Sequence, residues 1–214
     1  MIVRELLLAI AVSLKTSGLA ALIASLIAVP AALLLAGSDF RGKRAVLLIN
    51  QTWMAAPTVA IGLLFYFLLS RSGPLGRFGL LYTQTAMTIG QVFLILPLII
   101  GFSYTALRQV DRRARLTALT LGASRRQAGW VVLREAKFAL LVAILAGFAR
   151  AVSEVGIAMM LGGNIRNSTR NITTVIALES AKGEFMNGVI LGGILLVLTF
   201  GINILVQVGL GSKE

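Results

Sequence analysis

Hydrophobic positions along the chain are gathered into long apolar segments that short polar stretches separate. Five segments stand out, at residues 16–36, 45–69, 83–107, 138–161 and 187–210. Each is long enough to cross a hydrocarbon core of about 30 Å as a helix with a rise of about 1.5 Å per residue. The pattern predicts an all-α, polytopic membrane protein with about five transmembrane helices in a single transmembrane domain, residues 1–214.

A shorter apolar stretch, residues 6–14, precedes the first segment and is bracketed by Arg4, Glu5 and Lys15. One helix through this stretch and the first segment would exceed the hydrocarbon core unless it tilted strongly. We therefore predict an N-terminal interfacial helix that lies on the membrane. The alternative is a signal peptide behind Arg4, which the lack of a soluble stretch after it disfavours.

Prolines and glycines interrupt the apolar segments. Pro30, Pro57 and Pro97 lie inside segments, where each removes a backbone hydrogen bond and favours a kink. Because the freed carbonyls need protein or water, kinked helices indicate a bundle around a path. Gly188 and Gly192 form a GxxxG pattern in the last segment, which is either a helix-packing face or a chance spacing.

The composition narrows the chemistry. The chain is 57% hydrophobic, against about 45–50% for soluble domains, and it has no cysteine and no histidine. Thiol chemistry, Cys/His zinc sites and Ser-His or Cys-His catalysis are therefore excluded. We expect no enzyme activity, no metal site and no cofactor. The net charge of +12 would suggest nucleic acid in a soluble protein, but in a membrane protein it marks the cytoplasmic side, so no nucleic-acid partner is expected.

The basic residues predict the orientation in the membrane. The loop 37–44 carries three, the loop 108–137 carries eight, and Lys213 lies in the tail, so one side holds twelve of the 20. The opposite side holds six, and Lys15 and Arg150 lie near or within apolar segments. Because the basic side faces the cytoplasm, we expect the N-terminus outside and the C-terminus in the cytoplasm.

The loop 37–44 reads GSDFRGKR and nearly matches the phosphate-binding pattern GxxxxGK[ST]. Arg44 replaces the hydroxyl residue that would bind magnesium, and the loop joins two membrane segments rather than a strand and a helix. The loop is therefore interpreted as a cytoplasmic marker. If ATP drives this protein, a partner must bind the ATP.

The loop 111–137 combines arginines with an apolar row. Asp111 is a natural N-cap, Gly122 suits a helix C-terminus, and Ser124 with Gln127 forms a capping box for a second helix. The sequence predicts a short helix, a sharp turn and a second helix. The apolar row and small residues such as Ala118 suit either a helix on lipid headgroups or close docking of a partner.

This loop resembles the coupling loop of ABC importer permeases of the type I fold, whose pattern is EAAxxxG, nine residues, then IxLP. Aligned on Gly122, Ala118 and the spacing match, whereas Leu116 replaces Glu and Arg134-Glu135 replaces Leu-Pro. "SLKTSGLAALIASLIAVPAALLLA" and "LTLGASRRQ" resemble the corresponding stretches of these and of molybdate permeases. "LREAKF", "SEVGIAMMLGGNI" and "TTVIALE" look closest to tungstate permeases.

The resemblance implies a homodimer, two ATPase subunits on the cytoplasmic side and an extracytoplasmic substrate-binding protein. It implies ATP-driven import of an oxyanion, tungstate first and molybdate second, by alternating access across the cell membrane. The alternative is an independent channel or a membrane scaffold without an ATPase. The expected ATPase-coupling residues are Leu116, Ala118, Leu119, Gly122, Ala123, Ser124 and Arg125.

Charges inside the fourth segment form a further candidate site. Arg150 and Glu154 are one helical turn apart, and a charge inside a membrane faces the bundle or water. They form either a structural ion pair or part of the pore lining, where Arg150 rather than the carboxylate would contact an anion. The pore and gate candidates are Arg150, Ser153, Glu154, Gly156 and Asn164.

The segment 162–186 is expected outside the membrane as a gate loop. Gly162 and Gly163 break the preceding helix, and residues 173–181 form a short apolar helix candidate. Arg166 and Arg170 are candidates for docking the binding protein or for attracting the anion, and a solvated loop is the alternative.

Overall fold

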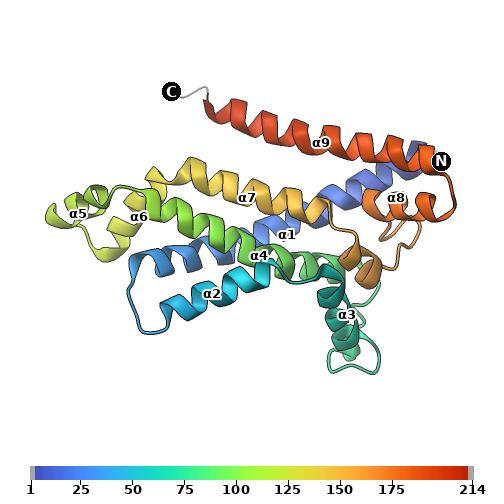
Figure 1. Ribbon diagram of the computed structural model, residues 1–214, viewed down its shortest axis with the longest axis horizontal. Coiled ribbons are helices and arrows are strands. Elements are labelled where there is room, and N and C mark those ends of the chain that lie inside the picture. Colours follow the sequence, from blue (N-terminus) through green and yellow to red (C-terminus); the bar gives the residue numbers. More distant parts are fainter. Residues whose placement is uncertain (1–2, 212–214) are drawn as a thin grey trace.

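The computed structural model describes the backbone of residues 3–211 and the side chains of residues 4–204 except Arg112. Within these residues the fold is all-α, as the sequence predicts, and no strand is present (Figure 1). A 3₁₀ turn, η1 (Gly76–Phe78), and a π turn, η2 (Ala158–Gly162), join the α-helices. The α-helices are α1 (Val3–Gly37), α2 (Lys43–Met54), α3 (Thr58–Leu69), α4 (Gln84–Gln109), α5 (Arg112–Thr120), α6 (Arg125–Glu135), α7 (Lys137–Val152), α8 (Ile172–Ala181) and α9 (Phe185–Gly211).

α1 is one continuous helix of 35 residues, so the prediction of a separate interfacial helix is wrong. Its N-terminal half is held inside the protein by polar contacts. Ser13, Thr16 and Ser17 are each 1% exposed, and the Ser13 Oγ accepts the Ile172 N–H at 3.0 Å. Because these contacts bury one face of residues 6–17, this stretch forms the first part of α1 and not a separate helix.

α4 forms the centre of the bundle and packs against both α1 and α7. Small residues of α1, such as Ala20 and Ala24, are fully buried there beside Ile95 and Ile99 of α4. A Cβ added at Gly147 of α7 would lie 2.6 Å from the Ile99 side chain. The close packing of the bundle therefore depends on small side chains on the outer helices.

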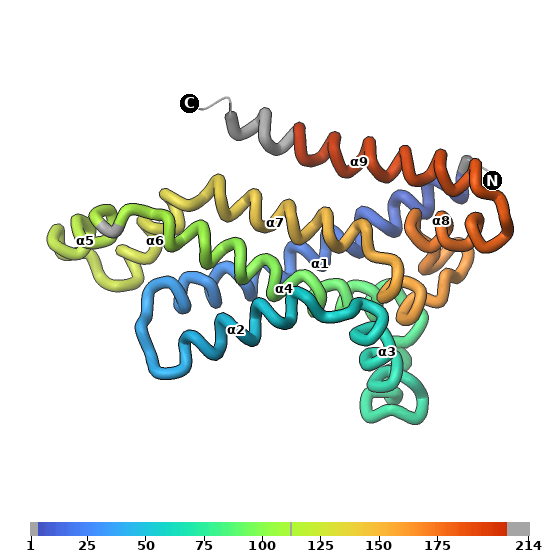
Figure 2. The backbone as a smooth tube through the Cα atoms, in the orientation of Figure 1, coloured from blue at the N-terminus to red at the C-terminus, as the bar shows by residue number. Residues whose placement is uncertain are grey.

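The second apolar segment is not one straight span. α2 and α3 are bent by 96° at a break, and Pro57 caps α3 in an extended conformation. α3 therefore projects from the bundle (Figure 2). The fourth segment is also interrupted, because α7 ends at Val152 and η2 follows a short non-helical stretch. Three described helices are long and apolar enough to span, or four if the bent pair is one span, against about five expected.

The two loops assigned to opposite sides of the membrane lie at opposite ends of the bundle. α5 and α6 form an arm at one end, whereas α8 and the start of α9 lie at the other (Figure 1). Residues 111–137 and residues 162–186 are therefore separated along the length of the bundle, and their sides of the membrane stay a prediction.

Candidate functional site

The arm at residues 111–137 folds as predicted. The Asp111 carboxylate accepts the Arg113 N–H at 2.9 Å, and Gly122 adopts a left-handed φ of 86°. The Ser124 Oγ accepts the Gln127 N–H at 3.3 Å, while the Gln127 Oε1 accepts the Ser124 N–H at 2.7 Å. The capping box and the left-handed glycine together fix a helix–turn–helix.

The arm presents apolar side chains to its surroundings. Leu116 is 57% exposed, Leu121 82% and Trp130 59%. Ala118, Leu119 and Ala123 are half-buried, and Gly122, Ser124 and Arg125 are exposed. Exposed leucine and tryptophan beside arginines are typical of a surface that another molecule covers. Leu121 and Trp130 were not predicted from the sequence, because neither belongs to the helical stripe of α5.

The arm is fastened to the bundle at its base. The Arg115 Nη1 donates to the Gly37 carbonyl oxygen at the end of α1, at 3.3 Å. Ala128 of α6 is fully buried, and Val132 and Leu133 pack on a buried cluster of α1, α4 and α7 residues. The base of the arm therefore contacts three helices of the bundle.

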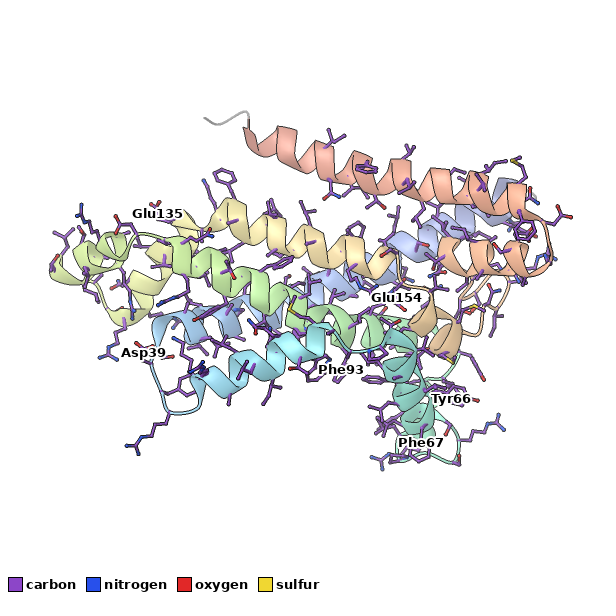
Figure 3. The ribbon with its side chains drawn as sticks, in the orientation of Figure 1. Asp39, Tyr66, Phe67, Phe93, Glu135 and Glu154 are labelled. Atoms are coloured by element: carbon purple, nitrogen blue, oxygen red, sulfur yellow. The ribbon has the colours of Figure 1, made fainter. Side chains whose placement is uncertain are left out.

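The break after α7 contains the predicted ion pair. The Arg150 Nη1 lies 2.8 Å from the Glu154 Oε2, and the Glu154 Oε1 accepts the Ile157 N–H at 3.2 Å. The Glu154 side chain is 3% exposed and that of Arg150 is 37% exposed. Figure 3 shows Glu154 where α7 ends. The Glu154 carboxylate therefore links Arg150 before the break to Ile157 after it. The Arg150 guanidinium stays partly exposed to the surroundings.

The break after α7 meets the break between α2 and α3. A Cβ added at Gly156 would lie 3.3 Å from Val59 and 3.4 Å from the Thr58 Oγ1, both in the first turn of α3. A Cβ at Gly62 would lie 3.6 Å from the Gly156 carbonyl oxygen. In transporters, interrupted helices of this kind occur where irregular backbone lines a cavity. The juxtaposition makes residues 153–156 and the start of α3 the candidate pore segment.

A buried glutamine joins this segment to α1. The Gln91 side chain is fully buried, and its Nε2 donates to the Ala151 carbonyl oxygen at 3.1 Å and to the Ser17 Oγ at 3.3 Å. Its Oε1 has no hydrogen-bond partner among the described residues. Gln91 is not among the residues predicted from the sequence, although a glutamine inside an apolar segment indicates a buried polar contact.

Hydrogen bonds and an ion pair of its polar side chains hold the gate loop in place. Asn164 has a positive φ of 50°, and its Oδ1 accepts the Arg170 Nε at 3.1 Å. Arg166 forms an ion pair with Glu5 of α1. Hydrogen bonds from Lys182 and Asn187 hold the pKa of Glu179 below its ordinary value. Arg170 is therefore part of the loop's internal structure, whereas Arg166 is 60% exposed on its side chain.

The family described as "Binding-protein-dependent transport system inner membrane component" matches residues 28–210. The chain belongs to this family.

The permease is similar to proteins of this family that are named as anion permeases. A probable anion ABC transporter permease of Haloferax volcanii is 40% identical over 91% of this chain and 86% of its own length. Tungstate uptake system permeases of Campylobacter jejuni and Peptoclostridium acidaminophilum are 39% and 38% identical, over 77% and 89% of this chain and 69% and 84% of their own lengths.

The permease is thus a multi-pass membrane protein of the ABC transporter branch whose relatives carry the names tungstate, molybdenum and sulfate permease. Membership implies ATPase and substrate-binding partners. The structure brings Arg150, Ser153, Glu154 and Gly156 together at one break. It places Asn164 in the separate gate loop, held by Arg170.

Proposed function

We propose that this permease is the membrane-spanning subunit of an ATP-driven importer for tungstate, with molybdate as the second candidate. Sequence identity to named relatives supports tungstate over molybdate as the first candidate. The tungstate permeases match at 38–39%, whereas a molybdenum permease of Azotobacter vinelandii matches at 27%. The substrate is a tetrahedral oxyanion in both cases, and the chain performs no covalent chemistry on it.

The arm is the proposed contact with the ATPase. Leu116, Leu121 and the tight turn at Gly122 form a small apolar projection that fits a groove, and the neighbouring arginines suit an acidic rim. Two ATPase subunits would bind the two arms of a homodimer. Closing of the ATPase pair on ATP would shift each arm, and α6 would pass the shift to α1, α4 and α7 through their shared apolar cluster.

The interrupted helices are the proposed path. A shift of α7 would move the Arg150–Glu154 loop against the start of α3, so that the pore opens alternately to each side. Arg150 offers a guanidinium edge that can contact the anion briefly. The Glu154 carboxylate would repel the anion, but its ion pair and the Ile157 N–H neutralise it.

The binding protein is placed at the opposite end, where the gate loop lies. This requires the N-terminus outside and the C-terminus in the cytoplasm. Arg166 is the proposed docking contact on this side, and Arg170 supports the loop that carries it.

Reconstitution tests the proposal. The permease, its ATPase and its binding protein would be placed in proteoliposomes, and uptake of labelled tungstate would be measured with and without internal ATP. We expect ATP-dependent uptake that excess molybdate reduces more than excess sulfate. An anion current through the permease alone, without ATP, would instead establish the independent channel.

A further inference from the structure

A cleft lies between the first half of α1 and the gate loop. It has a volume of about 220 Å³, which leaves room for several water molecules. The side chains of Lys15, Arg166 and Arg170 line it, together with Ala11 and Glu5. Three cations and one carboxylate give the lining a net charge of +2. A cluster of like charges beside an apolar helix is unfavourable unless an anion or water compensates it.

The three cations differ in how they are held. Arg166 is paired with Glu5, and Arg170 donates to the Asn164 Oδ1 and the Asn164 carbonyl oxygen. Lys15 makes no hydrogen bond or ion pair with any other described residue, and its side chain is exposed. Lys15 and Arg170 therefore carry the two charges of the cleft that no carboxylate offsets, and of these only Lys15 lacks a hydrogen-bond partner among the described residues. Lys15 lies within a helix long and apolar enough to span.

We propose that this cleft binds a tetrahedral oxyanion group, with the Lys15 ammonium as its main contact and Arg166 and Arg170 as its flanking donors. Ammonium and guanidinium groups are the donors that oxoanions prefer. The cleft is large enough for one tetrahedral oxoanion together with water molecules. Two sources share this chemistry: the free substrate anion on the gate side, and the phosphate of a lipid headgroup at the end of α1. The free-anion source rests on the proposed function, whereas the charge of the cleft does not.

An introduced cysteine tests the cleft directly, because the chain has none of its own. Ala11→Cys places a single thiol in the lining. Its reaction rates with an anionic sulfonatoethyl and a cationic trimethylammonioethyl methanethiosulfonate would be measured in nanodiscs and divided by the rates of a small free thiol. We expect the anionic reagent to be favoured in zwitterionic lipid. Adding Lys15→Gln should slow the anionic reagent and speed the cationic reagent by about threefold each, from one unit charge at a separation near 7 Å in water.

Two further measurements distinguish the two sources of the anion. Protection of the thiol by tungstate or sulfate in zwitterionic nanodiscs identifies a free-anion site. Loss of the anionic preference in phosphatidylglycerol nanodiscs, larger than the loss at an exposed Glu184→Cys control thiol outside the cleft and without any effect of tungstate, identifies a lipid phosphate site. Arg77→Gln is the matched control, since it removes an exposed cation that does not line the cleft.

The proposal is overturned if the thiol shows no preference between the reagents in zwitterionic lipid, or if Lys15→Gln changes neither rate. These measurements need neither ATP nor partners, so they stand whether or not the permease imports tungstate.

Discussion

Arg150 and Glu154 form an ion pair at the end of α7, with the Arg150 Nη1 2.8 Å from the Glu154 Oε2. The Glu154 Oε1 accepts a hydrogen bond from the Ile157 N–H. The Thr173 hydroxyl of α8 also donates to the Glu154 carbonyl oxygen at 2.9 Å. One residue thus joins the end of α7, the η2 turn and the start of α8. The ion pair is therefore a structural element as well as part of the proposed pore.

Removing the arginine should destabilise the permease. Arg150→Ala leaves the Glu154 carboxylate buried without its counter-charge, which we expect to cost about 3 kcal/mol. Glu154→Gln should cost less, because an amide oxygen can still accept the Ile157 N–H. Thermal unfolding in detergent, monitored by size-exclusion chromatography, measures the loss of stability in both variants. A wild-type midpoint for Arg150→Ala would show that the pair does not hold the break closed.

Two glycines should respond oppositely to alanine. At Gly147 a methyl group would lie 2.6 Å from Ile99, so Gly147→Ala should force α7 away from α4 and cost about 1–3 kcal/mol. At Gly192 no atom lies within 4 Å of the added Cβ, so Gly192→Ala should stabilise α9 by roughly 0.5–1 kcal/mol. The same thermal assay compares them. A loss of stability in Gly192→Ala would indicate that another chain covers the GxxxG face.

The exposed leucine of the arm should determine ATPase affinity. Leu121→Ser removes a side chain that is 82% exposed in the isolated chain, and burial of a leucine is worth about 1.5–3 kcal/mol. We expect at least about tenfold weaker binding of the ATPase, measured by titration of nanodisc-embedded permease. Leu75→Ser, in a loop outside the arm, is the control and should bind normally.

Charge or bulk at the turn should have a similar effect. Ala118→Arg and Gly122→Arg should still insert in the membrane but lose co-purification with the ATPase. Because Gly122 has a φ of 86°, Gly122→Asn separates backbone strain from bulk, since asparagine tolerates this conformation. Full co-purification of both arginine variants would contradict the coupling role of the arm.

Single cysteines should report the orientation. Thr117→Cys lies on the arm and Glu184→Cys lies at the opposite end, and both positions are exposed. A membrane-impermeant maleimide applied to intact cells should label Glu184→Cys at once and Thr117→Cys only after permeabilisation. The reverse order would invert the topology and remove the basis for placing the ATPase on the arm.

The sequence by itself determined the helical class, the membrane environment and the arm. These features depend on local causes. Apolar segments must bury their backbone polar groups as helices, and Asp111, Gly122, Ser124 and Gln127 set the arm's boundaries through short-range hydrogen bonds. The ion pair of Arg150 and Glu154 also has a local cause, because residues at i and i+4 lie one helical turn apart.

Only the tertiary structure decided how the segments are interrupted and extended. The N-terminal stretch continues into α1 because Ser13 and Ser17 find partners on α8 and α4, more than seventy residues away. The 96° bend before α3 and the break after α7 face each other because Gly156 and Gly62 allow close contact. The cleft at Lys15 likewise combines residues about 150 positions apart, and no local pattern records such a contact.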